Sequence, residues 1–394
     1  MTDILEAPAS PATPDQAPTR AALSGVLDIA RDGHGLLRGA GLLPHTGDAR
    51  VAAPLIRQLG LRTGDFVEGT GERPRALTRA ERVNGRAPRE LRHRPRFHDL
   101  TPLHPRQRLR LDGPAGGAAG GVAARVVELL APVGKGQRGL IVAPPKTGKT
   151  VLLQQLAAAV AGNHPECHLM VVLLDERPEE VTDMRRSVRG EVYASTFDRT
   201  PQDHTALAAL AVERAKRLVE GGEDVVILLD SLTRLCRAHN NAASGSGRTL
   251  SGGVDAAALH GPKRLFGAAR RTEEAGSLTI LATALVDTGS RADDFYFEEL
   301  KSTGNMELRL DRALAAERIH PAVDIAGSGT RREELLTPAA ELATLRAVRR
   351  ALHARDARTG LTTLLEKVRG TPDNASFLRA MRSTVPGVPG VPEA

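Results

Sequence analysis

Aromatic and sulfur-containing side chains are scarce in this 394-residue sequence, which has no Trp, two Tyr, seven Phe and two Cys. The cysteines, Cys167 and Cys236, stand in unrelated contexts. This argues against a disulfide scaffold or a thiolate zinc site and fits a reducing compartment. The twelve histidines lack cysteine partners and the spacing of a zinc motif, so no zinc site is expected.

Long apolar runs are missing as well. No stretch approaches the roughly 18 uninterrupted apolar residues that a membrane-spanning helix needs. The first residues also lack the basic segment and apolar run of a secretory signal. We therefore predict a cytoplasmic protein without a membrane partner.

Positive charge is in excess, with 54 Lys and Arg against 47 Asp and Glu, a net charge of +7. This balance suits an anionic partner. Charge alone does not separate nucleic acid from a membrane surface or from a GC-rich codon bias. The chain is long enough for two or three domains with a sizeable core.

Two different patterns divide the chain. Short apolar runs broken by Gly and Pro (SGVLDIA, GLLRG, ARVAAPLIRQLGLRTGD, FVEGT) predict a small β-barrel early in the sequence. Later, buried-type strands alternate with amphipathic helices, which predicts an α/β fold whose parallel sheet is covered on both faces. The predicted parts are a disordered tail 1–20, a barrel 21–110, a linker 111–124, an α/β domain 125–336, helices 337–383 and a tail 384–394. Thr337 is the expected N-cap of the first of those helices.

A phosphate-binding loop is predicted at residues 143–150, APPKTGKT, between an apolar strand and a helical pattern. Backbone N–H groups of such a loop wrap the phosphates of ATP. Lys149 would face the β- and γ-phosphates, and the Thr150 hydroxyl would bind Mg²⁺. Ala143 replaces the first glycine of the general motif, and an ordinary basic turn before a helix is the alternative.

Two acidic residues end predicted strands and are expected near this loop. Asp230 closes DVVILLD, where a carboxylate can hold Mg²⁺. Glu176 follows LMVVLLD and is the candidate for polarising the attacking water. The alternative for Asp175 and Glu176 is capping of the helix that follows.

Beyond these motifs, residues 133–336 resemble the Rho family of bacterial transcription termination factors in the order and spacing of their segments. Those segments include VGKGQRGLIVAPPKTGKT, LDERPEEVTDM, VVILLDSLTRL, TGNMELRLDR and SGTRREELL. The preceding ~110 residues resemble the same family's RNA-binding domain. The resemblance implies a RecA-like P-loop ATPase core, an OB/cold-shock-like β-barrel and a C-terminal helical part. It further implies a homohexameric ring with ATP between subunits and single-stranded RNA through the hole.

By the same resemblance, the family's nucleotide-site roles fall on matching positions. Glu176 is the catalytic base, Lys149 and Asp230 act beside it, and Arg331 is an arginine finger that reaches the neighbouring subunit. Thr150 and Asp230 hold the metal. The remaining nucleotide-binding positions are Lys146, Thr147, Gly148, Val151, Arg177, Arg318 and His320. Taken alone, Arg331 would be interpreted as a partner of Glu333 or Glu334 on the surface.

RNA contacts are implied at three places. Arg248, Thr249 and Ser251 lie in the segment 240–253 that matches a central loop of the family, and Arg291 lies in a second loop at 287–294. Solvated surface loops are the alternative. In the barrel, the matching positions are His34, Leu36 and Arg38.

The barrel departs from the family pattern, because His34 and Leu36 stand where two stacking aromatics are usual. Such stacking is worth about 1–3 kcal/mol per base. Twelve arginines between Arg73 and Arg110, against three acidic residues, could supply phosphate contacts instead, although codon bias also explains them. His320 likewise replaces an aromatic that packs on adenine.

Three hypotheses remain at this point. The first is an RNA-dependent ATPase and 5′-to-3′ RNA translocase or helicase that releases nascent RNA from RNA polymerase, with elongation factors as further partners. The second is a divergent member of the family that regulates rings or binds RNA with weak hydrolysis. The third is a RecA-fold ATPase that acts on DNA or in a rotary complex.

Overall fold

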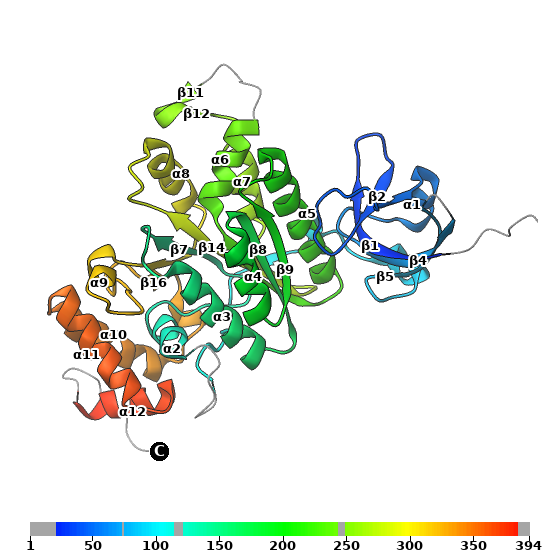
Figure 1. Cartoon of the computed structure of the whole chain (residues 1–394). Helices are drawn as coiled ribbons and strands as arrows, with labels where there is room; N and C mark the ends of the chain where they lie inside the picture. Colours follow the sequence, from blue (N-terminus) through cyan, green and yellow to red (C-terminus); the bar gives the residue numbers. More distant parts are fainter. Residues whose placement is uncertain (1–20, 73–74, 114–120, 243–248, 385–394) are drawn as a thin grey trace, which may run out of the picture.

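The structure is a computed structural model that describes residues 21–72, 75–113, 121–242 and 249–384 (Figure 1). A barrel, an α/β domain and a group of helices follow one another along the chain. The predicted tail 1–20, half of the predicted linker, Arg248 and nearly all of the tail 384–394 lie outside the described residues. Among the described helices, none is long and apolar enough to cross a bilayer.

The N-terminal part is a closed five-stranded barrel in which the strand order is β1-β2-β3-β5-β4. Its elements are β1 (Ala21–Ile29), β2 (Gly35–Arg38), β3 (Ala49–Val51), α1 (Ala53–Leu59), β4 (Phe66–Glu72) and β5 (Ala76–Val83). Strands β3 and β5 are parallel and the other pairs antiparallel, and helix α1 bridges β3 and β4. Leu27, Leu37, Val51 and Val67 fill the interior. The prediction of a small OB-type barrel is confirmed.

Helix α1 lies within a run of residues that the sequence pattern predicted to be strand. Pro54 occupies the first turn, where its missing N–H costs nothing. Gly60 ends the helix with φ 62°, and its N–H bonds to the carbonyls of Arg57 and Ile56. The run ARVAAPLIRQLGLRTGD is therefore strand, helix and turn in succession.

The second part is built on a mostly parallel sheet in the order β16-β15-β7-β14-β10-β8-β9. Its strands are β7 (Arg138–Ala143), β8 (Cys167–Glu176), β9 (Glu191–Thr196), β10 (Asp224–Asp230), β14 (Ser277–Leu285), β15 (Met306–Arg309) and β16 (Gly329–Thr330). Strand β13 (Arg270–Thr272) pairs with β14 and with β6 (Pro102–Leu103), which ties the segment after the barrel to the sheet.

Helices cover both faces of this sheet, as the apolar strands predicted. Along β7, Ile141 belongs to the core under one face, and Leu140 and Val142 belong to the core under the other. The first face is covered by α2 (Gly121–Leu130), α3 (Lys149–Asn163), α4 (Pro178–Ser187) and α9 (Arg312–Ala316). The second is covered by α5 (Pro201–Glu220), α6 (Leu232–Ala242), α7 (His260–Phe266) and α8 (Arg291–Lys301).

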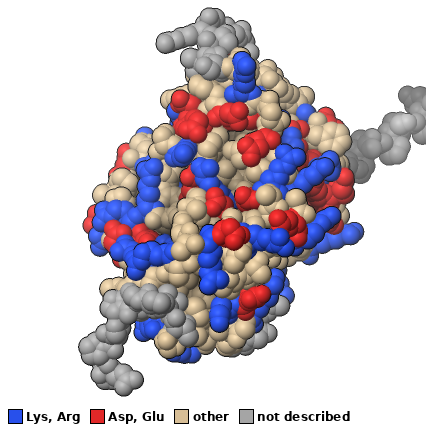
Figure 2. Space-filling view, turned by 90° about the vertical axis from the view of Figure 1, so that its left-hand side faces the viewer, with Lys and Arg blue, Asp and Glu red and all other residues tan. Residues whose placement is uncertain are grey.

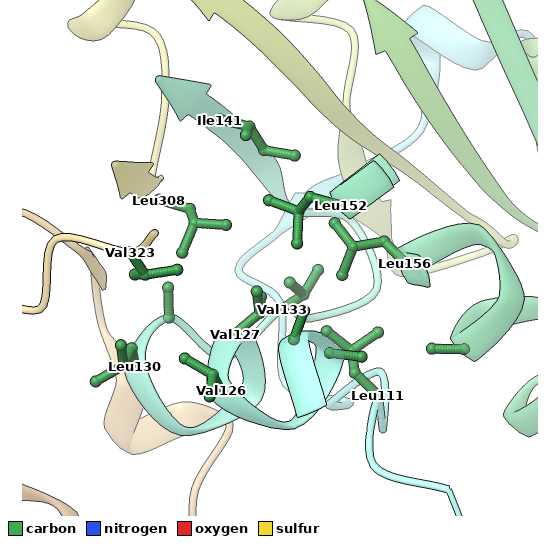
Figure 3. Packing of buried hydrophobic residues seen from close by; sticks show 14 of the residues in the cluster. Leu111, Val126, Val127, Leu130, Val133, Ile141, Leu152, Leu156, Leu308 and Val323 are labelled. Atoms are coloured by element: carbon green, nitrogen blue, oxygen red, sulfur yellow. The ribbon is translucent and has the colours of Figure 1, made fainter. Parts of the chain in front are cut away.

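Helix α2 corrects the predicted linker 111–124. The helix begins at Gly121, so residues 121–124 are helical. Figure 3 shows Leu111 at one edge of an apolar cluster with Val126 and Val127 of α2 and Leu152 and Leu156 of α3. Leu111 is fully buried there. The linker is shorter than predicted at both ends, because removing these apolar side chains from water stabilises the folded chain.

The C-terminal part consists of α10 (Ala339–His353), α11 (Ala357–Arg369) and α12 (Asn374–Thr384), and it packs on the α2 side of the sheet. The prediction of a helical part is confirmed. Thr337, however, is not the N-cap of α10. The helix starts after Pro338 without a side-chain cap, and Oγ1 of the buried Thr337 has no partner among the described residues.

Candidate nucleotide and RNA sites

The predicted phosphate loop lies between β7 and α3. Strand β7 ends at Ala143, and α3 begins at Lys149 behind an N-cap, Gly148, with φ 87°. Oγ1 of the buried Thr147 donates to the carbonyl of Pro144 at 2.8 Å, which closes the loop on itself. The loop therefore presents the N-terminus of a 15-residue helix to a ligand, the arrangement that binds phosphate.

Three predicted catalytic residues converge on this helix terminus. Nζ of Lys149 lies 2.6 Å from Oδ1 of Asp230 and 3.2 Å from Oε1 of Glu176. Asp230 ends β10, and Glu176 ends the neighbouring strand β8. Because carboxyl ends of parallel strands meet at one edge of the sheet, two strands far apart in sequence deliver both acids to the same point.

Electrostatic coupling in this group is strong. Burial raises the pKa of the Glu176 carboxyl above its ordinary value, and the neighbouring Asp230 raises it further, partly offset by Lys149. Burial works against the charge of Lys149, but Asp230 and Glu176 outweigh it and raise the pKa of the ammonium. The group therefore holds a fixed cation beside a carboxylate whose proton affinity is enhanced.

Both predicted metal ligands, Thr150 and Asp230, have a further oxygen-bearing side chain beside them. Oγ1 of Thr150 lies 3.2 Å from Oε2 of Glu180, and Oγ1 of Thr283 donates to Oδ1 of Asp230 at 2.8 Å. Hydroxyl and carboxylate oxygens are the ligands that Mg²⁺ prefers, so these residues fit that ion. Sequence reasoning did not single out Glu180 or Thr283, because their role depends on the packing of α4 and β14.

A cavity of about 630 Å³ adjoins the phosphate loop. Four predicted residues, Lys146, Val151, Arg318 and His320, line it together with Gln155. Thr147 and Gly148 complete its loop side, and a Cβ at Gly148 would lie 3.5 Å from the His320 ring. Val151 and Gln155 lie one helical turn apart on α3, which places them on the same face. The cavity suits a nucleoside, and Gln155 is a lining residue that the sequence did not reveal.

The two remaining predicted arginines lie elsewhere. Arg177 precedes α4 and is largely exposed, 3.8 Å from Glu180. Arg331 follows the edge strand β16 and lines a separate cavity of about 340 Å³, with its N–H bonded to the carbonyl of Asn305 at 2.9 Å. Within one chain the structure does not bring Arg331 to the phosphate loop.

The acidic neighbours of Arg331 are engaged by other arginines. Glu333 pairs with Arg346 and Arg349, and Glu334 pairs with Arg332. Arg331 itself forms no ion pair within the described residues, so the interpretation of a local surface pair is wrong. The face that carries α8, α9 and α10 bears closely interleaved positive and negative side chains (Figure 2).

The two predicted RNA loops lie side by side. The hairpin of β11 (Thr249–Leu250) and β12 (Val254–Asp255) turns through a short helix, Ser251–Gly253, at which Gly252 has φ 75°. A Cβ at Gly252 would lie 2.9 Å from the backbone of Arg291 and Ala292, so this turn packs directly on the start of α8. Thr249, Ser251 and the exposed Arg291 therefore lie at one end of the domain, near the top of Figure 1.

Helix α6 connects these loops to the nucleotide acids. Near its start, Arg234 pairs with Asp175 and lies 3.7 Å from Glu176. One turn later, Arg237 binds both carboxylate oxygens of the fully buried Asp293 on α8. At its far end, Oδ1 of Asn240 accepts the N–H of Asp255 at 2.8 Å.

The predicted RNA-binding positions of the barrel differ in availability. His34 is exposed and Leu36 half-buried. Arg38 is largely buried and pairs with Asp28 at 2.7 Å and Asp48 at 2.8 Å, and these bonds raise the pKa of its guanidinium against the effect of burial. Arg38 is thus neutralised in the free chain, and its contact with RNA stays a prediction.

A P-loop ATPase domain joined to an OB-type barrel is the class of protein that this fold and site define. The model of the ATP synthase alpha/beta family nucleotide-binding domain matches residues 123–330, and the model of the Rho termination factor RNA-binding domain matches residues 23–89. The chain is 69% identical over 98% of its length to transcription termination factor Rho of Streptomyces coelicolor, of which it covers 91%. It is also 59% identical to Rho of Streptosporangium roseum, with 92% of each chain covered. The chain belongs to the Rho family of transcription termination factors.

Solved structures support the fold of the ATPase part. An ATPase of the type III secretion system of pathogenic bacteria matches 66% of this chain, and this chain covers 82% of it, with a TM-score of 0.57 and 21% identity. The assembled ATPase EscN of enteropathogenic E. coli gives the same TM-score at 20% identity, with 72% of this chain and 74% of that chain covered. At this identity the likeness shows the shared fold alone.

Proposed function

We propose that this chain is an RNA-dependent ATPase that translocates 5′-to-3′ along single-stranded RNA and releases transcripts from RNA polymerase. The observation that carries the proposal is the convergence of Lys149, Glu176 and Asp230 at the helix terminus of the phosphate loop. Membership of the Rho family supports the RNA substrate. The alternative of a regulator with weak hydrolysis is not favoured, because this catalytic group is intact.

Different residues of the chain bind the phosphates, accept a proton and enclose the nucleoside during hydrolysis. The N-terminus of α3 and Lys149 bind the β- and γ-phosphates, so ATP binding exchanges the carboxylate partners of Lys149 for phosphate oxygens. Glu176 accepts the proton of the water that attacks the γ-phosphorus, and the bond to the β–γ bridging oxygen breaks to give ADP and phosphate. Mg²⁺, held through Thr150 and Asp230, would supply charge neutralisation on the same phosphates. Val151, Arg318 and His320 enclose the nucleoside, and Arg177 borders the γ-phosphate side.

A homohexamer explains why Arg331 lies far from its own phosphate loop. In a ring with head-to-tail interfaces, one edge of each subunit faces the opposite edge of the next. Arg331 then completes the neighbouring site, where an arginine finger is worth about 10³–10⁵ in turnover. The loops that hold Thr249, Ser251 and Arg291 face the RNA in the hole, with His34, Leu36 and Arg38 of the barrel as outer contacts.

ATP turnover measured with poly(C), with single-stranded DNA and without nucleic acid tests this proposal. We expect turnover to rise with RNA and to vanish in Lys149→Ala, while Lys146→Ala retains part of it. Equal turnover without nucleic acid would rule out the RNA motor. Stimulation by DNA alone would favour a DNA-directed ATPase instead.

A further inference from the structure

A basic groove lies between the barrel and the ATPase domain. It encloses about 640 Å³ between the barrel residues 39–49 on one side and α4 and β9 on the other. Figure 1 shows the loop of the barrel reaching toward these elements. Of the residues considered so far for ATP or RNA, Arg75, one of the twelve arginines between Arg73 and Arg110, lines this groove.

The helix face that borders the groove carries no acid. Pro178, Val181, Thr182 and Arg185 line it and follow the i, i+3, i+4, i+7 spacing of one face of α4. The acidic residues of the same helix, Glu179, Glu180 and Asp183, project from other faces and are absent from the lining. The groove is therefore bordered by a face of α4 on which Arg185 is the charged residue, although the helix as a whole carries both signs of charge.

Three arginines supply the charge of the groove. Arg185 and Arg199 are exposed, and neither forms an ion pair in the part of the chain that the structure describes, although Arg199 lies close enough to Asp198 to help lower the pKa of that carboxyl. Arg75 lines the groove from the barrel side, where its guanidinium donates to the carbonyl of Gly47 in the neighbouring barrel loop at 2.7 Å. A Cβ at Gly47 would lie 2.2 Å from that guanidinium, so the glycine is what allows Arg75 to lie there.

The acid among the described lining residues is held in an ion pair outside the groove lining. Asp48 is 6% exposed and pairs with Arg38 at 2.8 Å. The positive charge among the described lining residues is therefore that of Arg75 on the barrel and of Arg185 and Arg199 on the ATPase domain. Guanidinium groups that line one cavity are stabilised by an anion that binds in it.

We propose that this groove binds the phosphate backbone of single-stranded RNA as it passes from the barrel to the ATPase domain. The proposal rests on the proposed action on RNA and adds a binding site to it. RNA is favoured because one wall of the groove belongs to the part of the chain that matches an RNA-binding domain. The described lining residues include no Phe, Tyr or Trp, and His45, whose Nδ1 accepts the N–H of Gly47 at 2.9 Å, is their one imidazole, so the contacts are mainly to phosphate and depend little on base sequence.

The test is the salt dependence of RNA binding by the full chain without ATP. Fluorescence anisotropy with a labelled oligocytidine is measured between low and moderate salt for Arg185→Glu, Arg199→Glu and the double variant. For single strands, each lost phosphate contact reduces the magnitude of the negative slope of log K against log salt by about 0.7. We expect the slope to fall by about 1.4 in the double variant, from two such contacts.

Arg186→Glu is the matched control, because Arg186 follows Arg185 on α4, is exposed and does not line the groove. An equal fall of the slope in the control would overturn the proposal, since it would show a general effect of charge. An unchanged slope in all variants would overturn it too and leave an acidic protein segment as the occupant.

Photocrosslinking of the unmodified chain with oligouridine that contains 4-thiouridine provides a measurement that does not depend on a variant. Crosslinked peptides from 178–185 together with 39–47 support the proposal. Crosslinks confined to the barrel positions His34 and Leu36 and to the loops at 249–251 and 291 contradict it. RNA-stimulated ATP turnover of the unmodified chain tests the proposed function separately, so the two failures are distinguishable.

Discussion

At the residue scale, Glu176 is set apart by its buried position between a cation and a second acid. Its raised pKa means that protonation removes the basic form at a higher pH than for an exposed glutamate, so turnover is lost early on acidification and recovers as the pH rises. Glu176→Gln should lower turnover by about 10²–10⁴, the usual share of general-base catalysis, and leave ATP binding intact. The measurement is the pH profile of turnover together with nucleotide affinity.

Glu179→Gln is the control for this prediction, since Glu179 is exposed and makes no bond in the described part of the chain beyond its own helix. The acid limb of its pH profile of turnover should coincide with that of the unmodified chain. A Glu176→Gln variant with normal turnover would show that another group accepts the proton.

Gln155 makes a different residue-scale prediction, about the choice of base. Its amide carries both a donor and an acceptor, and no hydrogen bond occupies it among the described residues. It can therefore pair with two edge atoms of adenine. Gln155→Leu should lower kcat/KM for ATP by about tenfold, the loss of a hydrogen bond or two, and should change that for GTP little. Gln154→Leu, one position away and outside the cavity, should alter neither.

The surroundings of His320 in the same cavity show that a histidine can close it. The imidazole lies against Gly148 and beside Pro321, so a flat ring still closes the nucleoside cavity. Equal losses for ATP and GTP in Gln155→Leu would mean that the residue shapes the cavity without reading the base.

At the element scale, helix α6 is a rigid link between chemistry and RNA. It starts beside Asp230, contacts the acids of β8 through Arg234, and holds α8 through the pair of Arg237 with Asp293. Oγ1 of Thr288 also donates to Asp293 at 2.6 Å, so this carboxylate holds the loop at 287–294 in place. A shift of α6 on ATP binding would therefore move the loop that carries Arg291.

Asp293→Asn should weaken the connection that α6 makes between the nucleotide site and the loop that carries Arg291. Charge-assisted hydrogen bonds contribute about 1.5–3 kcal/mol, so we expect the RNA concentration for half-maximal stimulation to rise by about tenfold while turnover without RNA persists. The measurement is ATP turnover as a function of RNA concentration. Asp294→Asn, an exposed neighbour on the same helix, serves as the control. A proportional loss with and without RNA would instead indicate a purely structural role for Asp293.

Elements were predicted well where periodicity and local chemistry agree. The strand, loop and helix around Lys149 follow from adjacent residues, and the burial of β7 on both of its faces follows from the apolar run that starts at Leu140. Helix α1 was missed because it has seven residues, too few for the spacing of its apolar positions to be distinguished from that of a short strand. The roles of Glu180, Gln155 and Thr283 could not be foreseen, since each depends on a neighbour far away in sequence.

At the scale of the whole molecule, the separation of Arg331 from its own phosphate loop determines how subunits cooperate. If the neighbour supplies this arginine, Lys149→Ala and Arg331→Ala each disable every site of a uniform ring. Mixed rings behave differently, because the intact loop of an Arg331→Ala subunit can face the intact arginine of a Lys149→Ala subunit. With random assembly from equal amounts, about one interface in four is complete, given head-to-tail contacts.

We therefore expect RNA-stimulated turnover to reappear when the two inactive variants are mixed under conditions that exchange subunits, at roughly a quarter of the unmodified level if sites act independently. Arg332→Ala is the control, because Arg332 pairs with Glu334 on its own chain and should keep turnover without mixing. Two results together would contradict a shared site. The mixture would show only the summed turnover of the separate variants, and Arg331 would lie far from every neighbouring phosphate loop in an assembled ring. Recovery would instead establish that hydrolysis at each site requires the adjacent subunit, so that only an assembled ring consumes ATP.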